Sequence, residues 1–135
     1  MSEENVQAAR QMTDAWNRGD IDGWARGLDD EVVWVPLAEN PETEPVRGRE
    51  ATREFVLNWV GPWDEYTIDV TKVVDHGDWV VVGAHHDAKH ESGAEISMDM
   101  WVAANYRDGR GVEFRWFTNE ADALRAVGIK NASSG

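Results

Sequence analysis

Histidine and carboxylate side chains cluster in one short segment of the second half of the chain. His85-His86-Asp87 is followed by His90 and Glu91, and these residue types bind metal ions or transfer protons near neutral pH. On a helix, His86 and His90 would share one face, as zinc ligands at positions i and i+4 do. The preceding run Val80-Val81-Val82 favours a strand, in which these two histidines lie about 13 Å apart. The sequence therefore predicts no metal site and leaves proton transfer as the chemistry open to this segment.

The composition excludes several other classes of function. Cysteine is absent, so the chain has no disulfide, thiol nucleophile or thiolate metal ligand. Among 135 residues, 26 acidic and 13 basic side chains give a formal charge of −13, which repels nucleic acid and anionic membranes. No apolar stretch reaches membrane-spanning length and no secretory signal opens the chain. We therefore expect a cytoplasmic protein with no nucleic-acid or membrane partner.

Tryptophan is unusually frequent for a chain of this length. Eight tryptophans occur in 135 residues, more than one core of this size normally holds. Indole side chains combine a large apolar surface with one hydrogen-bond donor, and they gather in cavities and interfaces. The sequence therefore predicts an aromatic-lined cavity or an aromatic interface.

Hydrophobic spacing predicts helices in the first half of the chain. Apolar residues recur every three or four positions before Gly19, and Asp20 is placed to cap a second, short helix. The expected elements of this half are helices at 4–18, after Asp20 and at 49–60, a strand at 31–35 and a loop at 38–45.

The spacing changes to a period of two from Tyr66 onward, which predicts strands. The expected elements are strands at 66–74, 79–90, 94–106 and 112–118, then a short helix at 120–127. Helices followed by an antiparallel meander give an α+β fold with the helices on one face of a curved sheet. We expect a single domain over residues 1–128 and a flexible tail at 129–135.

Several short stretches carry a resemblance to a known family. Ala15-Trp16-Asn17-Arg18-Gly19-Asp20 ends the first helix, Arg47-Gly48-Arg49-Glu50-Ala51 opens the third, and Tyr106-Arg107-Asp108-Gly109-Arg110 joins the last strands. With Val73-Val74-Asp75-His76-Gly77-Asp78, their order resembles the SnoaL-like branch of the nuclear transport factor 2-like superfamily. The resemblance implies a cone-shaped α+β barrel with three N-terminal helices packed in a curved, mainly antiparallel sheet, one deep pocket and, commonly, a homodimer.

The resemblance does not determine the reaction, because this superfamily includes isomerases, hydrolases, cyclases and non-catalytic binders. The polar groups of its steroid isomerases fall at Met12, Val35 and Val102, so the base and oxyanion donors of that reaction are missing. The Arg-x-Asp step of the limonene epoxide hydrolases is missing from the strands. Where the polyketide cyclases carry an acid, Asn119 cannot transfer a proton, and Glu120 is expected to be a solvated residue of a first helical turn.

The pocket wall follows from strand periodicity if Val35 and Val102 face inward, as the resemblance implies. The helices would add aromatic residues that serve either as core or as ligand contacts, and the methionines would be flexible wall or core filler. The predicted pocket residues are Met12, Trp16, Val35, Phe55, Trp59, Val82, Ala84, Met98, Met100, Val102, Ala104, Phe114, Trp116 and Thr118.

His86 shares this inward parity and is the candidate catalytic base, with Tyr66 or Thr118 to position a substrate. An apolar wall would lower the pKa of its imidazole. The alternatives are a histidine at the pocket rim or one bonded to a backbone carbonyl, and a register slip of one residue would turn it outward. Glu39 is the competing acid if its loop folds in.

Aromatic residues with the opposite parity predict an interface. Trp79, Trp101 and Phe117 would lie on the outer face of the sheet, where large exposed aromatics are unfavourable. A homodimer contact would bury them, and packing under the C-terminal tail is the alternative.

Three hypotheses about function remain open at this point. The first is an isomerase, lyase or hydrolase that acts on a small, uncharged, apolar molecule with His86 as base and no cofactor. The second is a non-catalytic binder of such a molecule. The third is a dimerising module with a vestigial pocket.

Overall fold

The computed structural model describes residues 2–38, 40 and 42–128. The predicted tail at 129–135 and Glu39 lie outside these residues. None of the described helices is long and apolar enough to cross a membrane. In chain order the elements are α1 (Ser2–Asn17), α2 (Ile21–Arg26), β1 (Leu28–Val35), β2 (Val46–Arg47), α3 (Arg49–Val60), β3 (Glu65–His76), β4 (Trp79–Lys89), β5 (Glu95–Arg107), β6 (Arg110–Phe117) and α4 (Glu120–Ala126).

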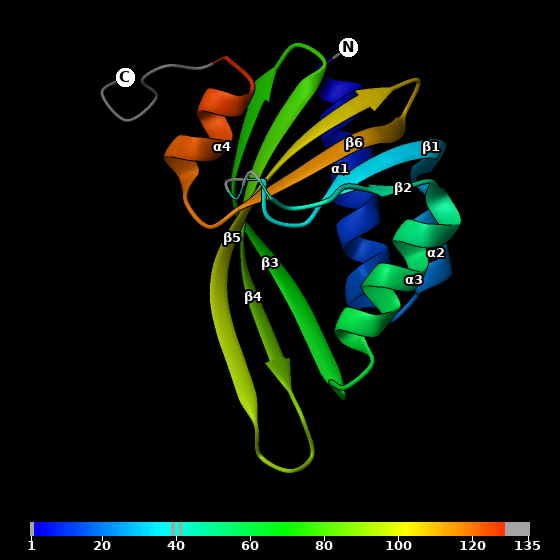
Figure 1. Ribbon diagram of the computed structural model, residues 1–135, viewed down its shortest axis with the longest axis vertical. Coiled ribbons are helices and arrows are strands. Elements are labelled where there is room, and N and C mark those ends of the chain that lie inside the picture. The colour runs from blue at the N-terminus through cyan, green and yellow to red at the C-terminus, as the bar shows by residue number, and fades with distance from the viewer. Residues whose placement is uncertain (1, 39, 41, 129–135) are drawn as a thin grey trace.

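The predicted α+β architecture is confirmed. The six described strands form one curved sheet in the order β2-β1-β6-β5-β4-β3. Neighbouring strands are antiparallel except β1 and β6, which are parallel. In Figure 1, α1, α2 and α3 gather on one side of this sheet and α4 lies on the other.

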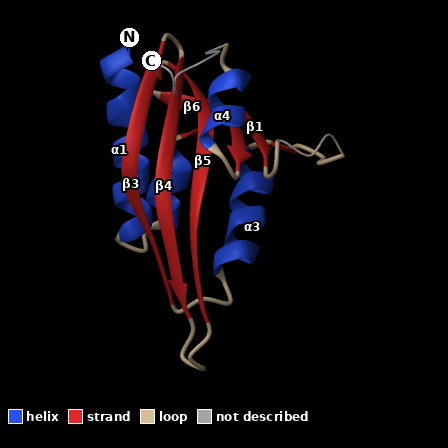
Figure 2. Cartoon of the chain, turned by 90° about the vertical axis from the view of Figure 1, so that its left-hand side faces the viewer, coloured by secondary structure: helices blue, strands red, loops and turns tan. Residues whose placement is uncertain are grey.

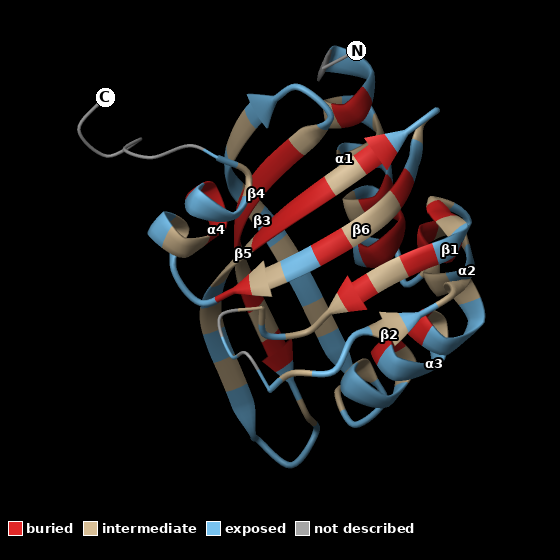
Figure 3. Cartoon of the chain, turned by 45° about the horizontal axis from the view of Figure 1, so that its top comes forward, coloured by how far each residue is buried: buried red, intermediate tan, exposed pale blue. Residues whose placement is uncertain are grey.

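The turns between the long strands follow from their residues. Asp108 and Gly109 both have positive φ, 54° and 77°, which suits the tight turn between β5 and β6. In the turn between β3 and β4, Gly77 alone has positive φ, 68°. The turn between β4 and β5 is the end of a long hairpin that projects beyond the helices (Figure 2). Its surface is exposed, whereas buried residues concentrate in the upper part of the sheet (Figure 3).

Polar contacts attach the helices to particular strands. Asn17, at the end of α1, exchanges two hydrogen bonds of 2.8 Å with the backbone of Ile68 in β3. Asp20 caps α2 by accepting a hydrogen bond of 2.8 Å from the Gly23 amide, as the sequence predicts. Arg49 donates to the carbonyl oxygen of Leu28 over 2.7 and 3.0 Å. These contacts place α1 against β3 and α3 against β1.

Two apolar clusters lie on opposite faces of the sheet. The larger one joins the concave face to the helices and includes Met12, Trp16, Trp24, Trp34 and Phe114. The smaller one lies under α4, where Ala123 and Leu124 pack against the outer face. The concave face, rather than the outer face, therefore carries most of the core.

The boundaries expected from the sequence need one substantial correction. The strand expected at 31–35 begins at Leu28, because its first part pairs with Gly111 of β6 before the register shifts. The segment expected as a loop at 38–45 leads into the two-residue strand β2. The other boundaries lie within about two residues of those predicted, an ordinary difference at the ends of helices and strands.

The outer-face aromatics have a partner within the chain. Trp79, Trp101 and Phe117 have the outward parity expected of them, and all three belong to the cluster under α4. Packing under α4 thus accounts for much of their burial. The predicted alternative, packing under the C-terminal tail, falls on residues outside those described. The homodimer stays a prediction.

Trp101 also lies across Gly83, the residue opposite it in β4. A Cβ atom built on Gly83 would stand 2.3 Å from the Trp101 ring, closer than atoms can approach. We therefore expect Gly83→Ala to displace the indole and to lower the free energy of unfolding by about 1–3 kcal/mol in urea titrations.

The matched control is the same substitution in a Trp101→Ala background. There the steric conflict is gone, so Gly83→Ala should be neutral or slightly stabilising. An equal loss of stability in both backgrounds would contradict the contact.

Candidate functional site

A cavity of about 430 Å³ opens between the concave face of the sheet and the helices. Its floor comes from β3, β4, β5 and β6, and its walls come from α1, α2, α3 and the end of β1. None of the described residues that line it is Asp, Glu, Lys or Arg. The cavity is therefore an apolar compartment inside a strongly acidic protein.

The structure places most of the predicted pocket residues in this wall. The predicted residues that line the cavity are Met12, Trp16, Phe55, Trp59, Tyr66, Val82, Ala84, His86, Met98, Met100, Val102, Phe114, Trp116 and Thr118. Ala104 is buried in the main core and does not line the cavity.

Val35 is a wrong prediction. It pairs with Arg115, whereas its neighbour Trp34 pairs with Phe114, whose ring faces inward. Since alternate residues of a strand face opposite sides, Trp34 rather than Val35 lines the cavity. The inward position expected for β1 is thus off by one residue.

Sequence analysis missed two large members of the wall, Trp24 and Trp34. Trp24 falls in the short helix after Asp20 and Trp34 in the strand expected at 31–35, and neither was predicted to face the cavity. Smaller or peripheral lining residues were missed as well, and these are Ala9, Thr13, Pro36, Leu37, Val56 and Ile68. The signal that could have found the two tryptophans is the overall excess of tryptophan in the sequence.

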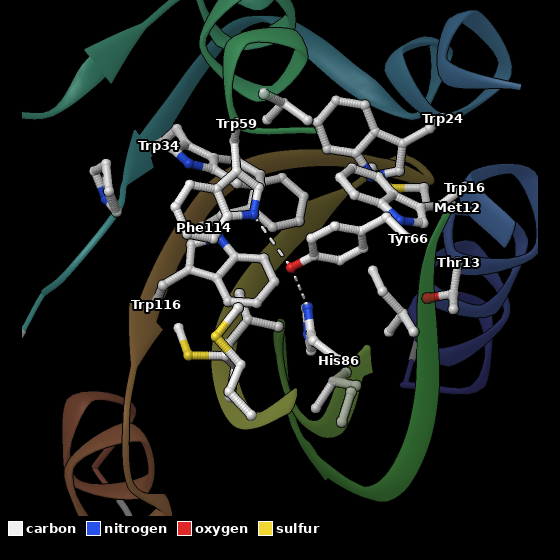
Figure 4. Close-up of a pocket in the computed structure, with 18 of the residues that line it drawn as sticks. Met12, Thr13, Trp16, Trp24, Trp34, Trp59, Tyr66, His86, Phe114 and Trp116 are labelled. Atoms are coloured by element: carbon white, nitrogen blue, oxygen red, sulfur yellow. Dashed lines mark hydrogen bonds between the residues drawn. The ribbon is translucent and has the colours of Figure 1, made fainter. Parts of the chain in front are cut away.

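Six aromatic rings form a closed circuit around the cavity (Figure 4). Successive ring centroids are 5.4–5.8 Å apart, and five of the six neighbouring pairs are edge-to-face. Such pairs hold each ring in a defined orientation. In order, the circuit runs through Trp16, Trp24, Trp34, Trp116, His86 and Tyr66 and returns to Trp16.

The polar groups of the cavity form a short hydrogen-bonded chain. The indole Nε1 of Trp59 donates to the phenolic oxygen of Tyr66 over 3.2 Å, and this oxygen lies 2.8 Å from Nδ1 of His86 (Figure 4). Burial lowers the pKa of His86 to about 4, and it raises the pKa of Tyr66. Both side chains are therefore uncharged at neutral pH.

The mouth of the cavity is apolar and open to water. Leu37, Phe55 and Trp59 line the cavity and are 39–49% exposed. They come from the segment after β1 and from α3, so the rim belongs to different elements from the floor.

His85 lies on the other side of the sheet from His86. Its Nδ1 is 2.8 Å from a carboxylate oxygen of Asp99, and its Nε2 is 2.8 Å from the hydroxyl of Ser97. The hydrogen bond with Asp99 raises the pKa of His85, and Asp87 adds to this effect. Two carboxylates that favour the imidazolium make His85 a poor base for activating Ser97. Within the described residues, no three His, Asp or Glu side chains are placed to hold a metal ion.

The chain belongs to the family of SnoaL-like domains, whose profile matches residues 9–114. No curated protein matches the sequence. The fold, the family and the geometry of the cavity thus agree, while the chemistry has to be inferred from the wall residues.

Solved structures of low sequence identity share this fold. A putative SnoaL-like polyketide cyclase from Jannaschia sp. CCS1 superposes with a TM-score of 0.76 at 20% identity, covering 93% of this chain and 92% of the other. An LEH-like epoxide hydrolase of Mycobacterium tuberculosis gives 0.72 at 17% identity, covering 93% and 90%. A further M. tuberculosis protein, in complex with estradiol-17beta-hemisuccinate, gives 0.74 at 15% identity, covering 86% and 94%.

The buried histidine makes the stability of the protein depend on pH. The pKa of His86 is about 4 in the folded chain and ordinarily 6.5, so the unfolded chain takes up the proton first as the pH falls. The stabilisation is complete above about pH 6.5 and is lost progressively toward pH 4. We expect a loss of about 2 kcal/mol between pH 7 and pH 5 in urea titrations.

His86→Gln is the control, because glutamine does not titrate. His85 and the carboxylates titrate in both proteins, so the difference between the two stability curves isolates His86. Parallel curves for the parent and His86→Gln would show that His86 is not buried as a neutral ring.

Proposed function

We propose that this protein binds an uncharged, predominantly apolar organic molecule inside the cone. The observation that carries the proposal is a cavity of about 430 Å³ with no charged residue among the described residues of its wall. A charged ligand would lose its hydration there without gaining a counter-ion. The volume suits a drug-sized metabolite.

The aromatic circuit and the open mouth support the same proposal. Edge-to-face packing fixes the rings around an open space, so the wall is prepared for a ligand before binding and little conformational entropy is lost. One structural neighbour is in complex with estradiol-17beta-hemisuccinate, and the apolar steroid skeleton of that compound, though not its carboxylate, supports a predominantly apolar ligand. A vestigial pocket would be expected to fill with side chains, so the third hypothesis fits the open cavity poorly.

Ligand-induced stabilisation tests the binding proposal. At about 100 times its Kd, a bound compound adds roughly 2.7 kcal/mol to the free energy of unfolding, which a thermal-shift screen detects. Ala84 lies on the cavity floor, so Ala84→Trp should fill the space and abolish the shift. Thr67→Trp, on the exposed face of β3, is the matched control and should keep it. Stabilisation by phosphorylated or dicarboxylate compounds alone would contradict the proposal.

A second candidate function is catalysis by proton transfer, which the hydrogen bond between Tyr66 and His86 favours. Because Nδ1 of His86 already faces the phenol at 2.8 Å, a substrate proton would pass to the Tyr66 oxygen while the phenolic proton passes to Nδ1. The products of this step are a substrate carbanion and an imidazolium. Its cost is the low pKa of His86, which disfavours the charged ring.

Once a substrate is found by turnover assays, His86→Ala and Tyr66→Phe should each lower kcat by about 10²- to 10⁴-fold, the usual effect of losing a positioned proton-transfer group. His86→Gln should bind the substrate without turning it over. Unchanged kcat in His86→Ala would contradict catalysis by His86 and leave ligand binding as the proposed function.

A further inference from the structure

The direction of the hydrogen bonds in the cavity determines where the proton of His86 lies. An indole nitrogen can only donate, so the Tyr66 oxygen accepts from Trp59. The phenolic proton of Tyr66 then points to Nδ1 of His86, which accepts it. Since a neutral imidazole carries one proton, that proton is on Nε2.

The reverse tautomer of His86, with the proton on Nδ1, satisfies fewer hydrogen-bonding groups. If Nδ1 carried the proton, it would donate to a phenolic oxygen that already accepts from Trp59. The phenolic proton and the Nε2 lone pair would then both lack a partner among the hydrogen bonds that the described residues form. The tautomer with the proton on Nε2 leaves one of these groups, Nε2–H, without a partner among the described residues, against two for the reverse tautomer, and is the one we adopt.

Besides the hydroxyl of Thr52, which does not line the cavity, two buried donors are left without a partner in the described part of the chain. These are Nε2 of His86 and Nε1 of Trp116, on rings whose centroids are 5.8 Å apart. His86 is only 4% exposed, so its Nε2 is largely shielded from bulk water. An unpaired buried donor is unfavourable, and a ligand that supplies an acceptor recovers part of that loss.

The methionines beside these donors do not block a ligand rigidly. Met98 lies directly across from His86 in the β4–β5 pairing, and Met100 lines the same floor. Methionine side chains adapt easily, so a small shift of either one opens a path to the nitrogen atoms.

We propose that the cavity selects apolar molecules that carry a carbonyl oxygen, which accepts a hydrogen bond from Nε2–H of His86, with Nε1–H of Trp116 as the second donor. This inference rests on the proposed binding function and adds the polarity of the ligand to it. His86 acts here as a donor that orients the ligand. Compounds whose only polar groups are donors fit this arrangement poorly.

The test compares 1-tetralone with tetralin, which have the same skeleton but differ by a carbonyl in place of a methylene group. Dissociation constants are measured by intrinsic tryptophan fluorescence for the full chain. We expect 1-tetralone to bind more tightly, and the carbonyl stretching frequency of the bound ketone to lie below its value in hexane. We also expect ¹⁵N NMR of the ligand-free protein to show the His86 proton on Nε2.

Variants test whether the two donors cause the tighter binding of 1-tetralone. Trp116→Phe removes one donor, and Tyr66→Phe/His86→Phe removes the other without leaving an unpaired hydroxyl. Each should lower the ratio of the tetralin Kd to the 1-tetralone Kd by about three- to tenfold, the usual contribution of one hydrogen bond. Phe114→Leu is the control: it should weaken both probes equally and leave the ratio unchanged.

The outcomes of these experiments distinguish a failure of the carbonyl inference from a failure of the proposed binding function. Equal affinities for the two probes, or an unshifted carbonyl frequency, would overturn the carbonyl inference while ligand binding stands. Failure of the parent protein to bind either probe, together with no stabilisation by any uncharged compound in the thermal-shift screen, would overturn both. The vibrational and NMR measurements need no variant, so poor folding of a variant does not prevent a decision.

Discussion

The pairing of β4 with β5 controls which side chains enter the cavity. It runs from Trp79 opposite Asn105 to Lys89 opposite Glu95 without a shift in register. Because alternate residues face opposite sides, this single register sends His86 and Met98 inward and sends His85 and Asp99 outward. A slip of one residue would exchange the apolar floor for a charged one. The polar cluster around His85 and Asp99 on the outer face and the apolar cavity on the concave face therefore both follow from this pairing.

Burial gives the few polar groups of the cavity their importance. Tyr66 and His86 are uncharged because a charged form would be poorly solvated among tryptophan and methionine side chains. Their hydrogen bond partly offsets the cost of placing polar atoms there. An apolar cavity with one fixed polar site can discriminate between ligands of similar shape. Such ligands fit the wall equally well but differ in whether they place a hydrogen-bonding group at that site.

Local sequence patterns predicted most of the fold and the parity of the long strands. His86, Met98 and Val102 were placed correctly because periodicity along a regular hairpin needs no long-range information. The position of β1 was wrong by one residue, because β1 pairs in parallel with β6, far away in the sequence, through a register shift between Leu28 and Val33. Nothing local to residues 28–35 indicates that shift.

The contact between Tyr66 and His86 depends on similar long-range detail. Tyr66 lies opposite Ala88, so it reaches His86 diagonally, along strands whose pairing shifts between Val70 and Lys72. Trp59 joins this chain from the last turn of α3, through a contact that no spacing rule predicts. Sequence alone could thus propose both residues, while the hydrogen bond that defines the site required the assembled sheet and helix.

The rim and the floor of the cavity are held in place by different forces. The floor belongs to strands hydrogen-bonded within one continuous sheet. Phe55 and Trp59 stand on a helix that is held by the contacts of Arg49 at its start and by the packing of buried Thr52 and Val56. Phe55, unlike Trp59, takes no part in the hydrogen-bonded chain to Tyr66 and His86, so a change at Phe55 can alter the width of the entrance while the arrangement of donors beneath it stays the same. The size of an admitted molecule and the way it is oriented inside are separately adjustable properties of this protein.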